Sequence, residues 1–211
     1  DALQIALKEP HRKTIFLGIG FETTAPGSAW LIQEAQRRQA PLSVLCGHKT
    51  MPQAMSALLS GGAVRIDGFL CPGHVSVIIG SRAYEPLCEQ YRVPCVIAGF
   101  EPLDMIRAIL MLLRQCLDRQ ARVECEYSRS VTREGNTRAQ SLLNAVFMPS
   151  EAEWRGLGSI PGSGLKIKSE YSAQDATQDI ASLSLPTPRD PPGCRCGDIL
   201  RGDVTPPECP L

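Results

Sequence analysis

Histidine and cysteine, which bind metals and move protons, occur at distinctive places in this sequence. The chain has three histidines among 211 residues, and two of them, His48 and His74, stand in loops beside glycine. Each follows a cysteine closely, Cys46 in the sequence CGH and Cys71 in the sequence CPGH. Imidazole changes its charge near neutral pH, and imidazole and thiolate are both zinc ligands. These two loops are therefore the first candidates for a functional site.

Two interpretations of the loop cysteines stay open. Together with the two histidines, Cys46 and Cys71 would supply four tetrahedral ligands to a zinc ion. Both cysteines, however, end apolar runs, where a cysteine is commonly a small buried hydrophobic side chain. We favour burial for the cysteines and a functional role for His48 and His74. Three further cysteines lie in apolar patterns and are expected in the core: Cys88, Cys116 and Cys125.

Two other loops carry a glutamate after a glycine and a phenylalanine. The sequence GFETT begins at Gly20, and GFEP begins at Gly99. A glycine at the end of a strand lets the backbone turn sharply and approach a ligand. Glu22 and Glu101 either cap the helix that follows, where a negative charge is favourable, or act on a ligand. The residue pattern is compatible with both roles.

These loops follow short apolar runs that alternate with helical patterns. The runs predict strands at Thr14–Ile19, Leu42–Cys46, Asp67–Cys71 and Pro94–Ala98. Helical spacing predicts helices at 27–39, 52–60, 75–91, 102–119 and 137–147. Strands with few polar residues, separated by helices, indicate a parallel sheet covered on both faces. We therefore predict an α/β fold with one doubly wound parallel sheet and helices on both faces.

In such a sheet, ligands bind outside the carboxyl ends of the strands. Because all four polar loops follow a predicted strand, we expect them to line one common crevice. The candidate residues are Gly20, Glu22, Thr23, Thr24, His48, Gly73, His74, Ser76 and Glu101. The sequence contains neither GxGxxG nor GxxxxGK[ST], so a nucleotide site has no motif to support it.

Composition excludes several classes of function. The 22 basic residues balance 22 acidic ones, so the formal net charge is zero, which does not favour binding to nucleic acid or anionic membranes. No apolar run approaches the roughly 20 residues of a membrane span, and no signal peptide is recognisable. Nine cysteines, an odd number, indicate reduced thiols. We expect a cytoplasmic protein.

The sequence predicts three segments. Residues 1–120 form the parallel-sheet domain, residues 121–181 add mixed strands and a helix, and residues 182–211 are a Pro-rich linker and an irregular tail. The tail holds Cys194, Cys196 and Cys209 among glycines and prolines, a setting typical of iron–sulfur or zinc ligation. One functional alternative is a small-molecule-binding α/β module with a zinc-stabilised tail. The chain opens on Asp1 and stops soon after Cys209, so we expect an internal fragment of a longer chain.

Several of these motifs together resemble a known family. They are GFETTAP from Gly20, DGFLCPGHVSVIIG from Asp67, AGFEPLDMI from Ala98, EWRGLGSI from Glu153, and CGDILRG followed by CPL from Cys196. In this order, along essentially the whole chain, they are similar to the HypD family of hydrogenase formation proteins.

The resemblance implies a cytoplasmic maturation factor for [NiFe] hydrogenases. Members form, with a small HypC-type chaperone, the scaffold on which an iron ion acquires two cyanides and one carbon monoxide. A HypE-type protein supplies the cyanide, and the hydrogenase large subunit receives the Fe(CN)2CO group indirectly. The family fold is two α/β domains and a C-terminal segment with a [4Fe-4S] cluster.

The resemblance also implies roles for particular residues. The loops that contain Gly20–Pro26, His48 and Pro72–Ser76 would line the crevice near the iron, where Thr23, Thr24 and His74 are suitable hydrogen-bond donors to cyanide. Cys196 and Cys209 match cluster ligands, whereas Cys194, Cys46 and Cys71 match no ligand position. The family's iron-binding cysteine would precede Asp1, and two more cluster ligands would follow Leu211. We expect the fragment alone to be inactive.

Overall fold

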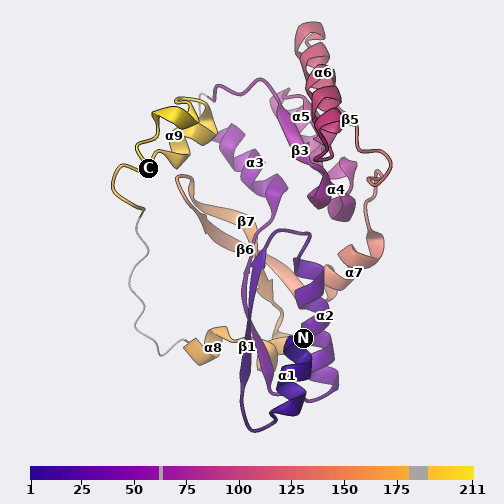
Figure 1. The fold of residues 1–211 in the computed structure, drawn as a ribbon, viewed down its shortest axis with the longest axis vertical. Coiled ribbons are helices and arrows are strands. Elements are labelled where there is room, and N and C mark those ends of the chain that lie inside the picture. The colour runs from indigo at the N-terminus through magenta and orange to yellow at the C-terminus, as the bar shows by residue number, and fades with distance from the viewer. Residues whose placement is uncertain (62–63, 181–189) are drawn as a thin grey trace. The chain divides into compact units, whose positions relative to one another are not determined.

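A computed structural model describes residues 1–61, 64–180 and 190–211 (Figure 1). The chain forms two units, each built from separate stretches of sequence. Unit 1 comprises Asp1–Met51, Arg138–Ala152 and Pro161–Arg189, and unit 2 comprises Pro52–Thr137, Glu153–Ile160 and Asp190–Leu211. These units differ from the contiguous segments 1–120, 121–181 and 182–211. Most of the predicted Pro-rich linker, residues 182–189, lies outside the described residues.

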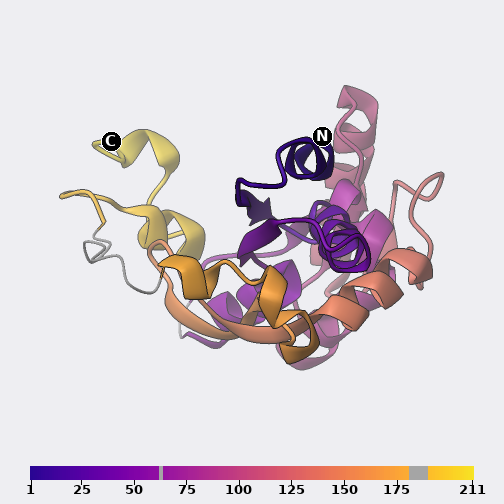
Figure 2. The ribbon, with the colours of Figure 1, turned by 90° about the horizontal axis from the view of Figure 1, so that it is seen from below.

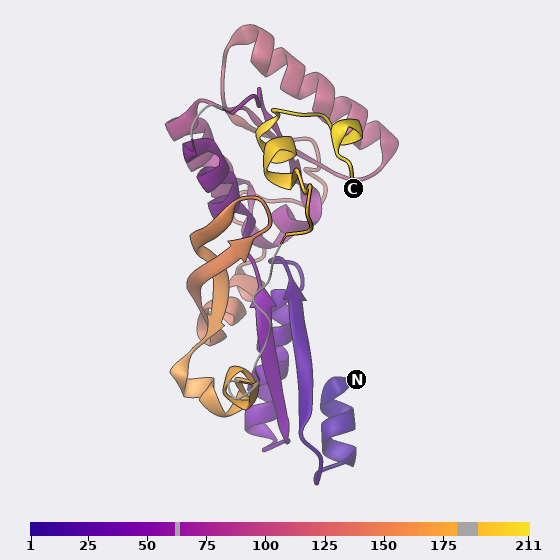
Figure 3. The same cartoon turned by 90° about the vertical axis from the view of Figure 1, so that its left-hand side faces the viewer.

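Unit 1 is built on two parallel strands, β1 (Thr14–Gly20) and β2 (Leu42–His48). Gly20 lies opposite His48 in the register, so the two carboxyl ends lie together (Figure 3). The two faces of β1 differ, and the exposed one carries Ile15, Leu17 and Ile19. Among the described residues of unit 1, β1 pairs with β2 and packs its other face, through Phe16, against the core.

Two helices complete the amino-terminal part of unit 1. They are α1 (Ala2–Lys8) and α2 (Ala25–Arg37). A proline lies in the first turn of α2. The N–H groups of a first turn have no acceptor within the helix, so proline, which has no N–H, loses no hydrogen bond there, and its fixed φ is already helical. The core beneath these helices contains Leu3, Ala6, Ala29, Leu31, Ile32, Ala35, Ala40, Leu42, Val44, Val146, Phe147 and Ile167.

A β-hairpin follows the last long helix of the chain. Helix α7 (Thr137–Val146) runs directly into β6 (Phe147–Trp154), which pairs with β7 (Gly158–Ile167) (Figure 2). The link between the two strands is far shorter than any parallel crossover, so the strands are antiparallel. Two short helices come next: η2 (Ser169–Gln174) and α8 (Thr177–Ile180).

Unit 2 holds a second parallel sheet. Its strand order is β3 (Phe69–Pro72), β4 (Cys95–Ala98) and β5 (Val123–Cys125), with β4 buried along its whole length. The predicted α/β class with parallel strands flanked by helices is confirmed. The prediction of one sheet is wrong in its pairing, because β1 and β2 belong to a different sheet from β3 and β4. Apolar runs identify strands, whereas tertiary packing decides which of them pair.

The helices of unit 2 differ from the predicted pattern in one place. Where the sequence predicts helical material from about Val75 through Tyr91, the chain forms three shorter helices, which are α4 (Gly73–Ile79), η1 (Ser81–Tyr84) and α5 (Glu85–Tyr91). The break occurs at Gly80, whose φ is +80°. A Cβ atom there would lie 2.3 Å from the carbonyl oxygen of Arg133, so this close approach requires glycine.

Two longer helices contribute to unit 2. Helix α3 (Met51–Ser60) begins at the end of unit 1, and α6 (Pro102–Asp118) packs on β4. Both agree with the predicted ranges 52–60 and 102–119 within two residues. Helix α6 ends at Arg119, which adopts the left-handed conformation that commonly closes a helix. Among the described residues, no helix has both the length and the apolar composition needed to cross a membrane.

The cysteine-containing tail is more regular than expected. It forms α9 (Cys196–Arg201) and η3 (Pro206–Glu208), within unit 2. The Arg65 N–H donates to the Arg201 carbonyl over 2.8 Å, which ties α9 to the chain before β3. The Glu208 carboxylate accepts hydrogen bonds from the backbone N–H and hydroxyl of Thr205, a capping box that closes η3.

Candidate functional site

In unit 1, the predicted residues gather where β1 and β2 end. The turn after β1 depends on Gly20, whose φ is +123° and whose added Cβ would lie 2.4 Å from the Thr24 hydroxyl. That hydroxyl donates to the carbonyl oxygens of Ile19 and Phe21, each at 3.2 Å. The Thr24 side chain is therefore occupied in holding the turn. Thr23, beside it, is partly exposed.

Glu22 is buried at the same turn, with 4% of its surface exposed. One carboxylate oxygen accepts the Met51 N–H at 2.9 Å, which joins the β1 turn to the start of α3. The other, Oε2, is buried and has no hydrogen-bond partner among the described residues. Desolvation raises the pKa of Glu22, opposed by the backbone hydrogen bonds at Glu22 and Met51. The carboxyl thus retains one oxygen that can hold a proton or meet a ligand.

We expect Glu22→Gln to change how stability depends on pH. A carboxyl whose pKa is raised by folding binds more protons in the folded state, so its contribution to stability is lost as the pH rises above the ordinary value of 4.5. The glutamine keeps an acceptor for the Met51 N–H and carries no charge. The free energy of unfolding, measured by urea denaturation, should exceed that of the wild type at pH 7, and the two should converge at low pH.

Glu34→Gln supplies a control with the opposite sign. The hydrogen bond from Arg37 lowers the pKa of Glu34 to about 2. Its ionised form stabilises the folded chain above the unfolded pKa, so Glu34→Gln should lose stability at neutral pH and recover the difference only in acid. A Glu22→Gln variant that behaved like Glu34→Gln would show that Glu22 is held as a well-paired carboxylate.

His48 is buried at the end of β2, with 2% of its surface exposed. Its Nδ1–H donates to the Gly20 carbonyl over 3.3 Å, and Nε2 lies 2.8 Å from the Ser28 hydroxyl. Desolvation lowers the pKa of His48, which favours the neutral ring, with Nε2 accepting the Ser28 proton. His48 therefore joins β1, β2 and α2 in one hydrogen-bonded cluster and has both ring nitrogens engaged.

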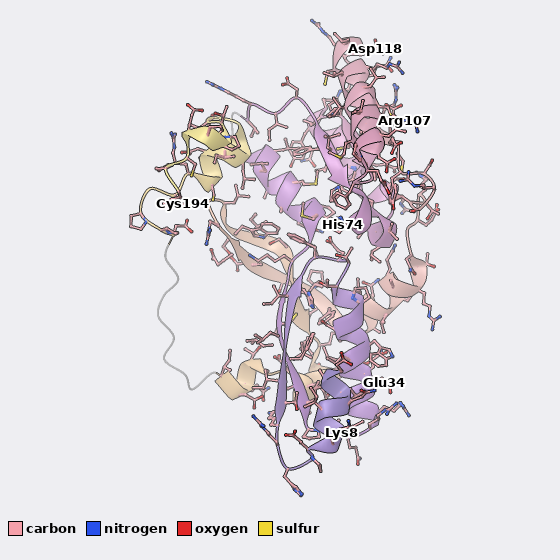
Figure 4. The ribbon with its side chains drawn as sticks, viewed as in Figure 1. Lys8, Glu34, His74, Arg107, Asp118 and Cys194 are labelled. Atoms are coloured by element: carbon pink, nitrogen blue, oxygen red, sulfur yellow. The ribbon has the colours of Figure 1, made fainter. Side chains whose placement is uncertain are left out.

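In unit 2, polar side chains follow all three strands of the sheet. His74 is exposed just after β3, and its ring lies 5.1 Å from that of Phe100, which follows β4 (Figure 4). Phe100 is 70% exposed, so neither ring belongs to the core. Among the described residues, no protein group forms a hydrogen bond with the His74 ring. This imidazole is available to a ligand or a partner.

Gly73 and Ser76 make contacts that hold α4 in place. A Cβ atom on Gly73 would lie 2.4 Å from the Ala98 carbonyl, so glycine lets α4 start directly against β4. The buried Ser76 hydroxyl donates to the Pro72 carbonyl at 2.8 Å and lies 3.1 Å from the Tyr84 hydroxyl. Both residues hold the helix that presents His74.

Sequence reasoning missed the residues that position Glu101. Arg129 donates to the Glu101 carboxylate at 2.7 Å and to both oxygens of Asp104, and its guanidinium lies 4.4 Å from the centre of the Tyr127 ring. The Arg129 hydrogen bonds lower the pKa of Asp104. A Cβ on Gly99 would collide with both Asp104 and Tyr127. In the sequence, the signal for these two residues was their position: Tyr127 and Arg129 follow β5 closely, at the same sheet edge as His74 and Glu101.

The predicted residues thus form two groups. Unit 1 brings together Gly20, Glu22, Thr23, Thr24 and His48, and unit 2 brings together Gly73, His74, Ser76 and Glu101. Within each unit they lie at the carboxyl ends of parallel strands. A crevice common to all of them stays a prediction.

The two loop cysteines, Cys46 and Cys71, each form a hydrogen bond inside the protein. Cys46 donates its thiol proton to the Leu165 carbonyl over 3.1 Å, and desolvation raises its pKa. Cys71 is buried in the other sheet, and its hydrogen bond with Cys95 is the first cause of the raised pKa of Cys95. Cys88 is buried as predicted, whereas Cys116 and Cys125 are only half-buried.

The tail cysteines lie near one another. A hydrogen bond between the Cys194 and Cys196 thiols raises the pKa of Cys196, and the charge of Cys209 acts in the same direction. All three are partly exposed, and Figure 4 labels Cys194. A [4Fe-4S] cluster needs four thiolates, and within residues 1–61, 64–180 and 190–211 no group of three or more metal-ligating side chains is arranged to hold a metal ion. The described residues therefore hold no complete set of four thiolate ligands.

These features define an α/β protein with two parallel sheets, polar side chains at the carboxyl ends of their strands, and a tail that contains cysteines. A family model described as "HypD: Hydrogenase formation hypA family" matches residues 1–211. The chain therefore belongs to the HypD family.

Similar proteins from several bacteria match the whole chain. Hydrogenase maturation factor HypD of Cupriavidus necator is 47% identical over 219 aligned residues, which cover 100% of this chain and 58% of the relative. The factor of the same name from Rhizobium leguminosarum bv. viciae is 43% identical over 219 residues, covering 100% and 57%. Hydrogenase expression/formation protein HupD of Azotobacter chroococcum is 43% identical over 218 residues, with the same shares. The chain thus spans less than three-fifths of the length of these relatives.

Proposed function

We propose that this chain is part of a cytoplasmic maturation factor for [NiFe] hydrogenases. The observation that carries the proposal is the family match over residues 1–211, together with relatives named hydrogenase maturation factors. The complete protein would be the scaffold on which iron acquires two cyanides and a carbon monoxide. Its proposed partners are a HypC-type chaperone, a HypE-type cyanide donor and, indirectly, the hydrogenase large subunit.

The iron group is the cargo of this scaffold, and the residues around it would bind and orient it. Cyanide nitrogens accept hydrogen bonds, so the site needs donors that the protein has not already used. His74 is exposed and has no protein hydrogen bond among the described residues, and Thr23 is partly exposed. Thr24 and His48 are engaged within unit 1. We therefore assign donation to His74 and Thr23, and positioning to Thr24 and His48.

Glu22 and Glu101 differ in their proposed roles. Glu22 has a buried, unpaired oxygen and a raised pKa, which suits a group that holds a proton near the cargo. Glu101 is mostly exposed and bound by Arg129, which suits a group that orients a ligand or a partner. The glycines of both turns, Gly20 and Gly73, bring the backbone close enough for such contacts.

The [4Fe-4S] cluster is proposed for the complete protein only. Cys196 and Cys209 would be two of its four ligands, and the hydrogen-bonded neighbour Cys194 would lie beside it.

In the full-length protein, we expect Cys196→Ser and Cys209→Ser each to remove the stable cluster, because each deletes one thiolate ligand. Cys194→Ser should retain it and serves as the matched control, since Cys194 lies beside the site and is no ligand. The protein is reconstituted anaerobically with iron and sulfide and then desalted, and the measurement is its absorbance at about 400 nm. Loss of the cluster in Cys194→Ser would overturn the ligand assignment. Stoichiometric zinc in place of iron and sulfide would favour an α/β binding module with a zinc-stabilised tail.

A further inference from the structure

Helix α6 exposes a row of large apolar side chains in unit 2. Their exposed fractions range from 43% to 82%. We call this row the α6 seam, and it consists of Leu103, Ile106, Ile109, Leu110, Leu113 and Leu117. The seam is distinct from the face that α6 buries, which packs on β4 through Ala108 with Met105, Met111 and Leu112 around it. An amphipathic helix normally exposes its polar side, so α6 has a second apolar face.

The spacing of the seam indicates what it would bind. From Leu103 through 106, 110 and 113 to Leu117, the intervals are three and four residues in alternation. This is the heptad spacing of a helix that packs along another helix, with leucine and isoleucine at the contact positions. A flat sheet edge or a small ligand would not require a row that runs the full length of the helix. The occupant that fits is a helix.

Charge next to the seam restricts that helix further. Arg107 and Arg114 directly follow the contact residues at 106 and 113, so both lie on the same side of the seam. Figure 4 labels Arg107 on α6. Arg107 is 60% exposed and forms an ion pair with Glu126 at 3.9 Å. Arg114 is exposed and forms no ion pair among the described residues. Flanking charges of this kind select partners of opposite sign.

A second copy of the chain does not satisfy this charge. In an antiparallel pair of α6 helices, the arginine flank of one helix would face the arginine flank of the other. In a parallel pair, it would face Ile109 and Cys116, which carry no negative charge. Neither arrangement gives Arg107 and Arg114 a carboxylate.

We propose that the α6 seam docks an amphipathic helix of a partner protein, with an apolar stripe in heptad spacing and acidic residues beside that stripe. This proposal rests on α6 alone and does not depend on the function proposed above. The occupant is defined by its chemistry, which is leucine-like contact residues and glutamate or aspartate flanks.

The test uses the full-length protein and two synthetic helical peptides of three heptads. Both carry leucine at the contact positions, and the flanking positions are glutamate in one peptide and lysine in the other. Fluorescence anisotropy at low salt should show binding of the glutamate peptide and at least tenfold weaker binding of the lysine peptide. The double variant Arg107→Glu with Arg114→Glu should reverse this preference, because the flank changes sign.

A variant of the seam provides the second arm. Leu110→Asp with Leu113→Asp should abolish binding of the glutamate peptide, whereas Ile5→Asp, at an exposed apolar position of α1 in unit 1, should leave it unchanged. Circular dichroism confirms that each variant is folded. Equal binding of both peptides, or binding of neither, would overturn the proposal. So would sedimentation showing a dimer that Leu113→Asp dissociates, because the occupant would then be a second copy.

Discussion

Replacement of His74 by alanine in the full-length protein is expected to abolish hydrogenase maturation and leave the fold intact. The imidazole is exposed, lies 5.1 Å from the exposed Phe100 ring, and is the one histidine of the site that has no hydrogen bond to a protein group among the described residues. Exposed side chains of this kind change the free energy of unfolding by about 0.5 kcal/mol or less. Hydrogenase activity in a deletion strain that carries the variant is the measurement, with urea denaturation of the purified protein beside it.

His11→Ala is the matched control, because His11 is also exposed but lies before β1, away from the carboxyl ends of the strands. It should support normal maturation. Wild-type hydrogenase activity with His74→Ala would refute the assigned role. Loss of soluble protein in the variant would show that His74 is needed for folding.

Gly73→Ala is expected to lower stability and maturation together. The new Cβ would lie 2.4 Å from the Ala98 carbonyl and 2.9 Å from the Tyr127 ring, so the start of α4 must move away from β4. Overpacking of this kind costs about 1–3 kcal/mol, and the shift displaces His74, the next residue. Thermal denaturation measures the first effect, and hydrogenase activity in the complemented strain measures the second.

Gly27→Ala isolates the effect of the added methyl group. No atom lies within 4 Å of a Cβ at Gly27, which is an exposed position of α2. There alanine should raise stability by about 0.5–1 kcal/mol, because it favours the helix. A Gly73→Ala variant as stable and as active as Gly27→Ala would contradict the close packing of α4 on β4.

The sequence predicted β1, β2, β3 and β4 well, because each is a short apolar run between helical patterns. It did not predict their pairing. The run at Thr14–Ile19 looks the same whether it pairs with one strand or lies between two, and the contacts that separate the two sheets come from distant parts of the chain. The break at Gly80 was also missed, because it depends on close contact with Arg133, more than fifty residues further on.

The sequence identified only part of the candidate site, because some of its residues are marked by a local signal and others are not. His74 and Glu22 are rare or charged side chains directly after apolar runs, which is a local signal. The engagement of His48 with Gly20 and Ser28 is not local, and it makes this histidine a positioning group. Arg129 was missed because β5 is three residues long and contains a glutamate, so it gave no apolar run to mark the end of a strand.

We propose that the complete protein carries iron with cyanide and carbon monoxide ligands. The direct measurement is infrared absorption of the full-length protein, isolated anaerobically from cells that are maturing hydrogenase. We expect cyanide and carbonyl stretching bands together with bound iron, and loss of these bands in the His74→Ala protein. A protein that is isolated in folded form without iron or such bands, from cells in which its deletion leaves hydrogenase fully active, would contradict it.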